Sequence, residues 1–565
     1  MGMADLAQLL EPLAGLRDRR RAPLVLELDL TEAIIDEPAA PPVAQLLGRR
    51  RQRFADVIEG VRRGAHDPQV AALVAKVDGR SLGFAKVQEV RDAVRAFRAA
   101  GKPTVAWGES IGEFGPSTVG YYLATAFEEI VLGPTGTLGL TGISMRAYFL
   151  REAAERLGIE TEAGARHEYK TAVNMLTERD FTEAHREAAE HLVSSLSEQV
   201  REGIAEARGL TAERVAELTA RGPLLAGEAL EAGLVDRLAY RDEVYAELLG
   251  RFGEPRLRYV PRYNRHKAAE RVPAPGRQDQ IALITAHGAI HSGPSRRSPV
   301  SGSASAGSDT VGAAFRAARR DPSVRAVVFR VDSPGGSHSA SDVIRREVRL
   351  TCEAGTPVIV SMGDVAASGG YYVALGARSV VAQPGTITGS IGVFISKPVT
   401  AGLLEKLGVG TGSVDSDPHA AMFEPARRFT ESEWDRVNAL LDAVYADFTG
   451  KVAEARGLDA EQVDRLARGR VWSGADAHRS GLVDELGGLE TAVRLAREAS
   501  GAEGAPLRPF PRPNPVERLR PAESSEERTA AQGRLDAWGP LAELSARLGL
   551  PAEGVLTLPG DWRVR

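Results

Sequence analysis

The sequence contains almost no cysteine and no long apolar segment. Its 565 residues include one cysteine, Cys352, so no disulfide can form within the chain, and the apolar helical stretch around this thiol predicts a place in the core. No apolar run approaches the roughly 18 to 20 residues that span a bilayer. The N-terminus lacks the charged, apolar and cleavage regions of a secretory signal. These absences predict a cytoplasmic protein without a transmembrane segment.

Neither sign of charge dominates the composition. The 71 Lys and Arg residues nearly balance the 76 Asp and Glu residues, which gives a formal net charge of -5. This balance predicts no nucleic-acid surface. Hydrophobic residues make up 43% of the chain and charged residues 26%, a composition that can bury large cores and excludes a disordered chain.

Residues 1–22 are expected to form an amphipathic N-terminal helix. Leucines recur there at helical spacing, and four arginines follow between positions 17 and 21. Two interpretations stay open. We favour docking of this helix on its own domain or on a neighbouring subunit; the alternative is a peripheral contact with an anionic membrane.

Two stretches of the chain repeat about 250 positions apart. Three motifs return in the same order: residues 120–124 (GYYLA) as 370–374 (GYYVA), 206–210 (EARGL) as 454–458, and 233–236 (GLVD) as 481–484. A unit of this length is far longer than a solenoid repeat. The chain is therefore predicted to hold two homologous domains, at 23–265 and 281–500, joined by a linker at 266–280.

Two further segments show no periodic pattern. Residues 292–309, rich in Ser, Gly and Pro, are expected to form a mobile surface loop. Residues 501–565 form a Pro-rich tail that belongs to neither repeat, with a short amphipathic helix expected near 541–548.

Each repeat alternates short β-rich runs with helical segments of 10 to 15 residues. This rhythm predicts βαβ units and a mainly parallel sheet covered by helices. Strands are expected at 24–30, 70–77, 104–107, 281–285, 324–331 and 357–362, and helices at 54–61, 85–99, 311–318 and 342–353. Longer helices at 182–208 and 431–456 are expected outside the sheet, as packing or oligomer surfaces.

Ser368 lies in a small-residue turn (VAASGG, 365–370) that follows a predicted strand and opens a predicted helix. At a helix N-terminus, unpaired amides and the helix dipole stabilise developing negative charge near the hydroxyl. The plain alternative is a serine that caps the helix, which is common.

A second turn (SPGG, 333–336) ends another predicted strand. Its Gly335-Gly336 pair lets the backbone expose adjacent amides close to a ligand, as an oxyanion hole requires. Taken alone, this turn is a weak signal. Two such turns at the carboxyl ends of strands in one sheet are a stronger signal, because open α/β sheets bind ligands there.

Lysine is scarce, with eight residues among the 71 basic ones. Lys170 lies in a loop before a long helix, and it is the best candidate for a base that activates Ser368, since the next histidine, His419, lies in a Pro-rich loop. Arginine could not serve, because its pKa exceeds 12. Burial that lowers a lysine pKa from about 10.4 towards 7 or 8 costs roughly 4 kcal/mol, so the site must be dry.

The chain resembles the signal peptide peptidase A (protease IV) family, in its long form, over about residues 24–500. The SPGG turn, the ASGGYY segment at 367–372, TGSIG at 388–392 and EYK at 168–170 occur in family order. The resemblance implies an α/β fold with two tandem Clp/crotonase-like domains.

The resemblance also implies a role for each site residue. Ser368 would be the nucleophile and Lys170 the general base, and Ser390 would hydrogen-bond the lysine. The backbone amides of Gly335 and Gly336 would form the oxyanion hole.

The repeat offers separate support for one site per chain. Ser368 corresponds to Thr118 in the first half, and Lys170 corresponds to Pro418, His419 or Ala420 in the second. Each half has kept one partner and lost the other, so the complete pair would form from both halves. The plain alternative is an accidental loss in two scaffold domains.

The expected function is a serine endopeptidase with a Ser-Lys dyad. It would degrade signal-peptide remnants and other unfolded or membrane-released peptides inside a homotetramer, without metal or organic cofactor and without nucleic acid. The turn residues predict a preference for small or apolar side chains. Two alternatives remain, a crotonase-like acyl-CoA enzyme and a catalytically inactive oligomeric scaffold.

Overall fold

The computed structural model describes residues 22–32, 34–36, 52–78, 82–253, 255–270, 278–297, 304–511, 534–535 and 556–557. Contacts divide the chain into two compact units. The first comprises Met1–Ser144 and Ser197–Pro275, with the last two residues of the chain, and the second comprises Met145–Leu196 and Gly276–Arg563.

The first unit is built on a six-stranded parallel sheet. Its strand order is β10-β6-β5-β4-β1-β11. Its central strands are nearly continuous buried apolar runs, as expected for a parallel sheet covered on both faces. The strands are β1 (Leu24–Asp29), β4 (Val70–Lys76), β5 (Thr104–Gly108), β6 (Glu129–Leu132), β10 (Arg237–Leu238) and β11 (Arg256–Tyr259).

The second unit repeats this sheet in the same order. Its parallel path runs β23-β19-β18-β16-β12-β24. The far end of β18 leaves β19 and pairs with β20 (Ile387–Gly389), which pairs antiparallel with β22 (Val471–Ser473). The path is formed by β12 (Gln280–His287), β16 (Val324–Ser333), β18 (Val358–Ala367), β19 (Ser379–Ala382), β23 (Glu485–Leu486) and β24 (Leu507–Pro509).

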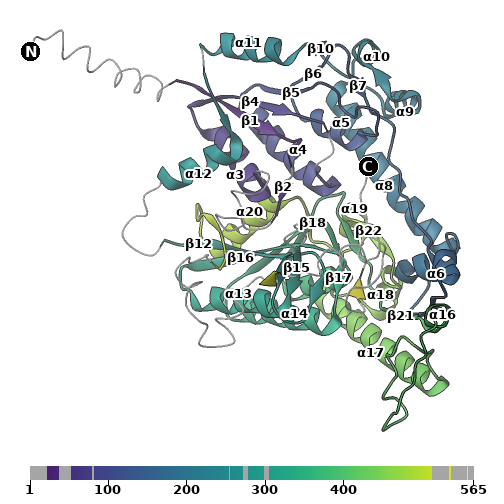
Figure 1. Ribbon diagram of the computed structural model, residues 1–565. Helices are drawn as coiled ribbons and strands as arrows, with labels where there is room; N and C mark the ends of the chain where they lie inside the picture. Colours follow the sequence, from purple (N-terminus) through teal and green to yellow (C-terminus); the bar gives the residue numbers. More distant parts are fainter. Residues whose placement is uncertain are drawn as a thin grey trace, which may run out of the picture. The chain divides into compact units, whose positions relative to one another are not determined.

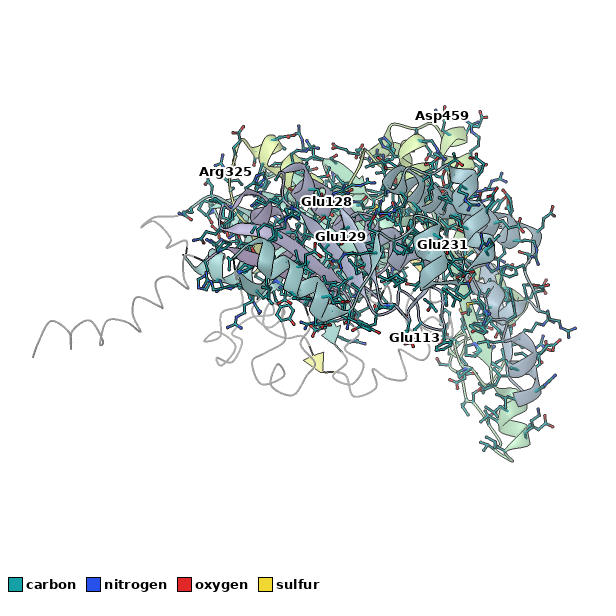
Figure 2. The ribbon with its side chains drawn as sticks, turned by 90° about the horizontal axis from the view of Figure 1, so that it is seen from above. Glu113, Glu128, Glu129, Glu231, Arg325 and Asp459 are labelled. Carbon is teal, nitrogen blue, oxygen red and sulfur yellow. The ribbon has the colours of Figure 1, made fainter. Side chains whose placement is uncertain are left out.

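Amphipathic helices cover both sheets. In α13 (Ser308–Arg320), the buried residues Val311, Ala314, Phe315 and Ala318 recur at helical spacing, and the Phe315 ring packs edge-on against Phe329 of β16 at 5.0 Å. Figure 1 draws α20 (Leu489–Ser500) above the second sheet, and α13 and α14 (His338–Glu353) below it. Charged side chains remain outside, such as Glu128 and Glu231 on the first unit and Arg325 and Asp459 on the second (Figure 2).

The remaining helices follow the same repeat. The first unit holds α3 (Phe54–His66), α4 (Phe84–Ala99), α5 (Thr118–Ala124), α9 (Ala212–Arg221), α10 (Ala226–Glu231), α11 (Arg241–Arg251) and α12 (Val260–Glu270). The second holds α6 (Arg151–Leu157), α7 (Asn174–Thr177), α15 (Gly369–Tyr372), α16 (Ala401–Lys406), α17 (Glu431–Arg456), α18 (Ala460–Leu466) and α19 (Gly474–Arg479). The long helix α8 (Glu183–Arg208) begins in the second unit and ends in the first.

The segment Met145–Leu196 lies within the first repeat of the sequence but belongs to the second unit. Its strand β8 (Glu160–Ala165) pairs antiparallel with β21 (Phe394–Val399). After β8 the chain forms a 3-10 turn, η1 (Thr171–Val173), whose Ala172 and Val173 are buried together with Phe394. This pairing brings the loop that carries Lys170 into the second unit.

Three boundaries differ from the sequence-based expectation. Strands β14 (Arg296–Arg297) and β15 (Ala304–Gly307) pair within the expected loop at 292–309, so that prediction is wrong for the described residues. Small polar side chains join the segments that flank this pair: the Gly307 amide donates to the Ser295 hydroxyl at 3.0 Å, and the Ser295 amide donates to the Thr310 hydroxyl at 2.9 Å. Helix α12 runs into the expected linker, and β24 joins the sheet from the expected tail.

Two predicted helices fall outside the described residues. They are residues 1–21 of the N-terminal helix and the short tail helix at 541–548. From the rest of the tail, β26 (Leu556–Thr557) pairs antiparallel with β17 (Gly335–Gly336).

Candidate active site

Three predicted site residues meet in the second unit. The Lys170 Nζ lies 2.8 Å from the Ser368 Oγ and 2.9 Å from the Ser390 Oγ. It also donates to the Ser390 carbonyl at 2.9 Å. All three residues are buried, with exposures of 3% or less. A neutral amine in this arrangement can accept a hydrogen bond from the Ser368 hydroxyl.

Burial controls the protonation of the lysine. Desolvation lowers the pKa of Lys170 to about 7. A large fraction of the amine is therefore neutral near pH 7, where an exposed lysine is almost fully protonated.

Ser368 follows β18 and precedes α15 in an unusual backbone conformation. Its φ of 54° and ψ of -115° are rare for a residue with a Cβ, and such strain costs on the order of 1–3 kcal/mol. The backbone is held on both sides: the Ser368 amide donates to the Gly389 carbonyl at 2.8 Å, and the Tyr372 amide donates to the Ser368 carbonyl at 2.9 Å. The hydroxyl makes no capping hydrogen bond, so the alternative of an ordinary N-cap is wrong.

Ser390 is held in a similar way after β20. Its φ is 51°, and its amide donates to the Arg470 carbonyl at 2.7 Å. Because the Ser390 hydroxyl and carbonyl both contact the Lys170 Nζ, this residue sets the position of the amine.

Two glycines pack against Lys170, a role that the sequence reasoning did not assign to either. A Cβ on Gly469 would lie 2.4 Å from the Lys170 nitrogen, and the φ of Gly469 is 87°. A Cβ on Gly392 would lie 3.2 Å from the Lys170 Cδ. Gly392 ends the TGSIG motif, which gave it no role of its own, and Gly469 stands in no motif that distinguishes it from an ordinary turn glycine.

An ionic contact holds the loop beside Lys170. The Tyr169 hydroxyl contacts the Glu187 carboxylate, to which Arg470 donates at 2.9 Å. The Arg470 guanidinium also lies 4.0 Å from the centre of the Tyr169 ring. Arg470 therefore contacts both the lysine loop, through its side chain, and Ser390, through its carbonyl.

The SPGG turn at 333–336, here called the glycine turn, lies next to Gly369, the residue that follows Ser368. A Cβ on Gly369 would lie 3.0 Å from the Gly336 nitrogen and 3.1 Å from the Gly335 Cα. Gly335 and Gly336 have φ angles of 102° and 156°, which the absence of a Cβ permits. The Gly335 amide donates to the Ser333 hydroxyl at 3.1 Å. The two turns thus meet at Gly336 and Gly369.

The residues that correspond to Ser368 and Lys170 in the other half of the chain make contacts unlike those of the candidate site. In the first unit, the Thr118 hydroxyl accepts hydrogen bonds from the amides of Thr141 and Gly142 at 3.0 and 2.9 Å. In the second unit, His419 is exposed and lies 3.2 Å from the Ser432 hydroxyl. The Ala420 amide donates to the Asp417 carbonyl at 3.1 Å within the same surface turn.

Comparisons with known proteins identify the family. The model of peptidase family S49 matches residues 96–250 and 351–503. The chain is 32% identical to Protease 4 of Salmonella typhi over 509 residues, which cover 86% of this chain and 79% of that protein. It is 30% identical to Protease 4 of Haemophilus influenzae over 459 residues, 78% and 72% of the two chains.

A chloroplast relative is similarly close in sequence. The chain is 32% identical to the chloroplastic serine protease SPPA of Arabidopsis thaliana over 444 residues, 77% of this chain and 64% of that protein. The chain thus spans slightly less than two thirds of this relative.

The chain belongs to peptidase family S49. The predicted resemblance to signal peptide peptidase A is confirmed, and so is the predicted α/β fold class with two tandem homologous domains. Across the residues that the structure describes, no helix has both the length and the apolarity to cross a bilayer.

Proposed function

We propose that the protein is a serine endopeptidase in which Ser368 is the nucleophile and Lys170 the general base. One observation carries the proposal: a buried lysine amine lies 2.8 Å from the hydroxyl of a serine in a strained strand-to-helix turn. Nucleophile and base within hydrogen-bond distance are the signature of covalent acyl transfer.

In the acylation step, neutral Lys170 takes the proton from Ser368 as the oxygen attacks the peptide carbonyl. The carbonyl carbon becomes tetrahedral, and its oxygen gains the negative charge. Lys170 then gives its proton to the leaving amine, and the carbon–nitrogen bond breaks to leave an ester on Ser368. Water, deprotonated by the same amine, hydrolyses the ester and restores the hydroxyl.

The glycine turn supplies the stabilisation of the oxyanion in this proposal. The contact between Gly336 and Gly369 supports an oxyanion hole beside Ser368, built from backbone amides that are oriented before the reaction. The Gly335 amide already has the Ser333 hydroxyl as an acceptor. The Gly336 amide is therefore the better candidate of the two.

Extended peptides are the proposed substrates, including signal-peptide remnants and other unfolded or membrane-released segments. The pairing of β26 with β17 supports this class, because it shows an extended segment running antiparallel along the glycine turn. The names of the relatives, Protease 4 and serine protease SPPA, agree with a peptide substrate. A homotetramer, and a cytoplasmic location with peripheral membrane contact, stay predictions.

A fluorophosphonate probe tests the proposal. Its phosphorus forms a bond with an activated serine oxygen and releases fluoride. We expect one adduct per chain, located on Ser368 by peptide mass spectrometry, and no adduct in Ser368→Ala. An unlabelled wild type that turns over acyl-CoA instead would favour a crotonase-like enzyme, and a wild type without either activity would favour a scaffold.

A further inference from the structure

A cluster of polar and charged side chains lies beside the candidate site in the second unit. We call His338, Asp342, Tyr372, Asp447 and Lys451 the charged cluster. The Tyr372 hydroxyl donates to the Asp447 Oδ2 at 2.6 Å and lies 3.2 Å from the Asp342 Oδ1. The Lys451 Nζ donates to the same two oxygens at 3.0 and 2.8 Å. The charged cluster is thus one connected network.

The charged cluster reaches both turns of the candidate site. Tyr372 ends α15, four residues after Ser368, and His338 begins α14, two residues after Gly336. The His338 Nε2 lies 2.8 Å from the Asp447 Oδ2, and its ring packs edge-on against the Tyr372 ring at 5.5 Å. The long helix α17, which carries Asp447, therefore contacts the first residue of α14 and the last residue of α15.

The charges of the cluster are mutually compensated. Asp342 and Asp447 are faced by Lys451, and Asp342 also accepts a hydrogen bond from the Arg345 Nε at 3.2 Å. Burial acts to raise the pKa of Asp447, but hydrogen bonds from Lys451, Tyr372 and His338 lower it to about 2. Burial raises the pKa of Tyr372 far above neutral pH, so its hydroxyl remains a donor. The network is therefore held together at neutral pH.

The first unit has the same helices without these charges. Helices α4 and α14 both span 16 residues, which aligns Asp342 with Gln88. The repeated EARGL motif aligns Asp447 with Gln199. In the first unit the Gln88 Nε2 donates to the Gln199 Oε1 at 2.9 Å, a neutral contact between the equivalent helices.

The other three positions of the charged cluster also carry no charged side chain in the first unit. Lys451 aligns with Gly203 and His338 with Phe84, while Tyr372 corresponds to Tyr122. The Phe84 ring stacks on the Tyr122 ring at 5.7 Å, so the ring packing is kept. The Arg91 guanidinium, equivalent to that of Arg345, lies 3.7 Å from the centre of the Tyr122 ring, but the two aspartates, the lysine and the histidine of the charged cluster have uncharged counterparts.

One ion pair between these helices is common to both units. Arg95 and Glu206 lie 3.0 Å apart in the first unit, and the equivalent Arg349 and Glu454 lie 3.5 Å apart in the second. The attachment of the long helix is therefore a property of the repeat. The charged cluster is a property of the unit that contains Ser368.

We propose that the charged cluster positions the two turns of the peptidase site, an inference that rests on the proposed function. Helix α15 has only four residues, and Ser368 and Gly335 both have positive φ angles, so local structure alone is poorly suited to hold them. The cluster ties the end of α15 and the start of α14 to the same turn of α17. Its residues are positioning residues, because they act through Ser368 and the glycine turn.

The test measures fluorophosphonate labelling rates and peptidase kcat and KM for Tyr372→Phe, Asp447→Asn and Lys451→Met. We expect labelling rates and kcat to fall about 10- to 100-fold, with KM changed less than about threefold, because displacement of reacting groups by about 1 Å costs this much. The midpoint of the pH profile should stay at the wild-type value, since the Lys170 contacts are untouched. Lys451→Arg should recover part of the lost rate.

The double variant Arg349→Met with Glu454→Gln is the matched control. It removes the ion pair between the same two helices and should keep the wild-type kcat. Circular dichroism and thermal melting of every variant report folding at the assay temperature.

Two results would overturn the inference. One is a wild-type labelling rate in Tyr372→Phe and Asp447→Asn. The other is a control variant whose labelling rate falls together with its melting temperature, in the same proportion as in the variants of the charged cluster. Failure of the proposed function is distinguishable, because wild type itself would then carry no adduct on Ser368.

Discussion

At the scale of single residues, the site depends on an amine that burial keeps partly neutral. Desolvation is the cause of the lowered pKa of Lys170, and its hydrogen-bond partners at the Nζ are serine oxygens. Ser368 and Ser390 hold these oxygens in place with φ angles of 54° and 51°. The strain at these serines is therefore associated with the geometry that brings three polar groups together.

The pH dependence of acylation follows from this amine. The base acts when it is neutral, so the rate should rise with pH through a midpoint near 7 and level off above it. Stopped-flow labelling from pH 5 to 9 measures this profile. Lys170→Arg should lose at least about 1,000-fold in rate at every pH in this range, because its guanidinium stays protonated. A midpoint near 10 would contradict the buried amine.

The sequence named the three side chains that meet at the site, and their chemical roles stay predictions. Ser368 and Ser390 stand in small-residue motifs, and Lys170 is one of only eight lysines, which made them visible. Gly469 and Arg470 were not visible, because their importance lies in contacts with a segment about 300 positions earlier. The charged cluster was missed for the same reason: aspartate and lysine on a long helix are indistinguishable from a solvated face.

At the scale of elements, the pattern of apolar residues was sufficient to predict the central strands of the sheets and most helices. Runs such as 24–30 and 324–331 became β1 and β16, because a parallel strand buried on both faces needs a continuous apolar stretch. Strands β8 and β21 were missed, since Glu160–Ala165 contains two glutamates and is only partly buried. They form through pairing with each other, and that pairing brings the loop that carries Lys170 into the second unit.

The close approach of two loops makes Gly469 a sensitive position. In Gly469→Ala, the new Cβ would collide with the Lys170 backbone and carry an unfavourable φ of 87°. We expect displacement of Lys170 and a loss of about 100-fold in labelling rate. Gly481→Ala is the control, because its φ of 79° is similar but its Cβ meets open space. Equal labelling rates in both variants would refute a role of this contact in placing Lys170.

At the scale of the whole molecule, a duplicated fold brings Lys170, Ser368 and Ser390 together in its second unit. Both units keep the sheet order, the tyrosine of the GYY motif and the Arg–Glu pair between equivalent helices. The sequence predicted this architecture because the repeated motifs survive in the buried helices α5 and α15, at the ends of α8 and α17, and just before β10 and β23. It did not predict that Met145–Leu196 joins the second unit, because such an exchange leaves the order of motifs unchanged.

The buried lysine should also reduce the stability of the whole chain. Its pKa is about 7 when folded and about 10.4 when unfolded, so the unfolded chain binds more protons between these values. The loss of unfolding free energy caused by burying this lysine is fully present below pH 7. It shrinks as pH rises and disappears above about pH 10.4. Lys170→Met should thus melt higher than wild type at pH 7, by an amount worth about 2–5 kcal/mol, with a smaller gain at pH 9.5. Calorimetry at both pH values measures this, and a gain that grows with pH would contradict it.

The antiparallel pairing of β8 with β21 has a consequence during synthesis. A ribosome makes the Lys170 loop about 200 residues before Ser368, and the strand that anchors this loop emerges later still. A nascent or prematurely terminated chain would therefore hold an amine without its hydroxyl. In the proposed dyad, hydrolytic activity would arise only after synthesis has passed Val399, the last residue of β21, which spares the translation machinery and neighbouring nascent peptides from an unfinished peptidase.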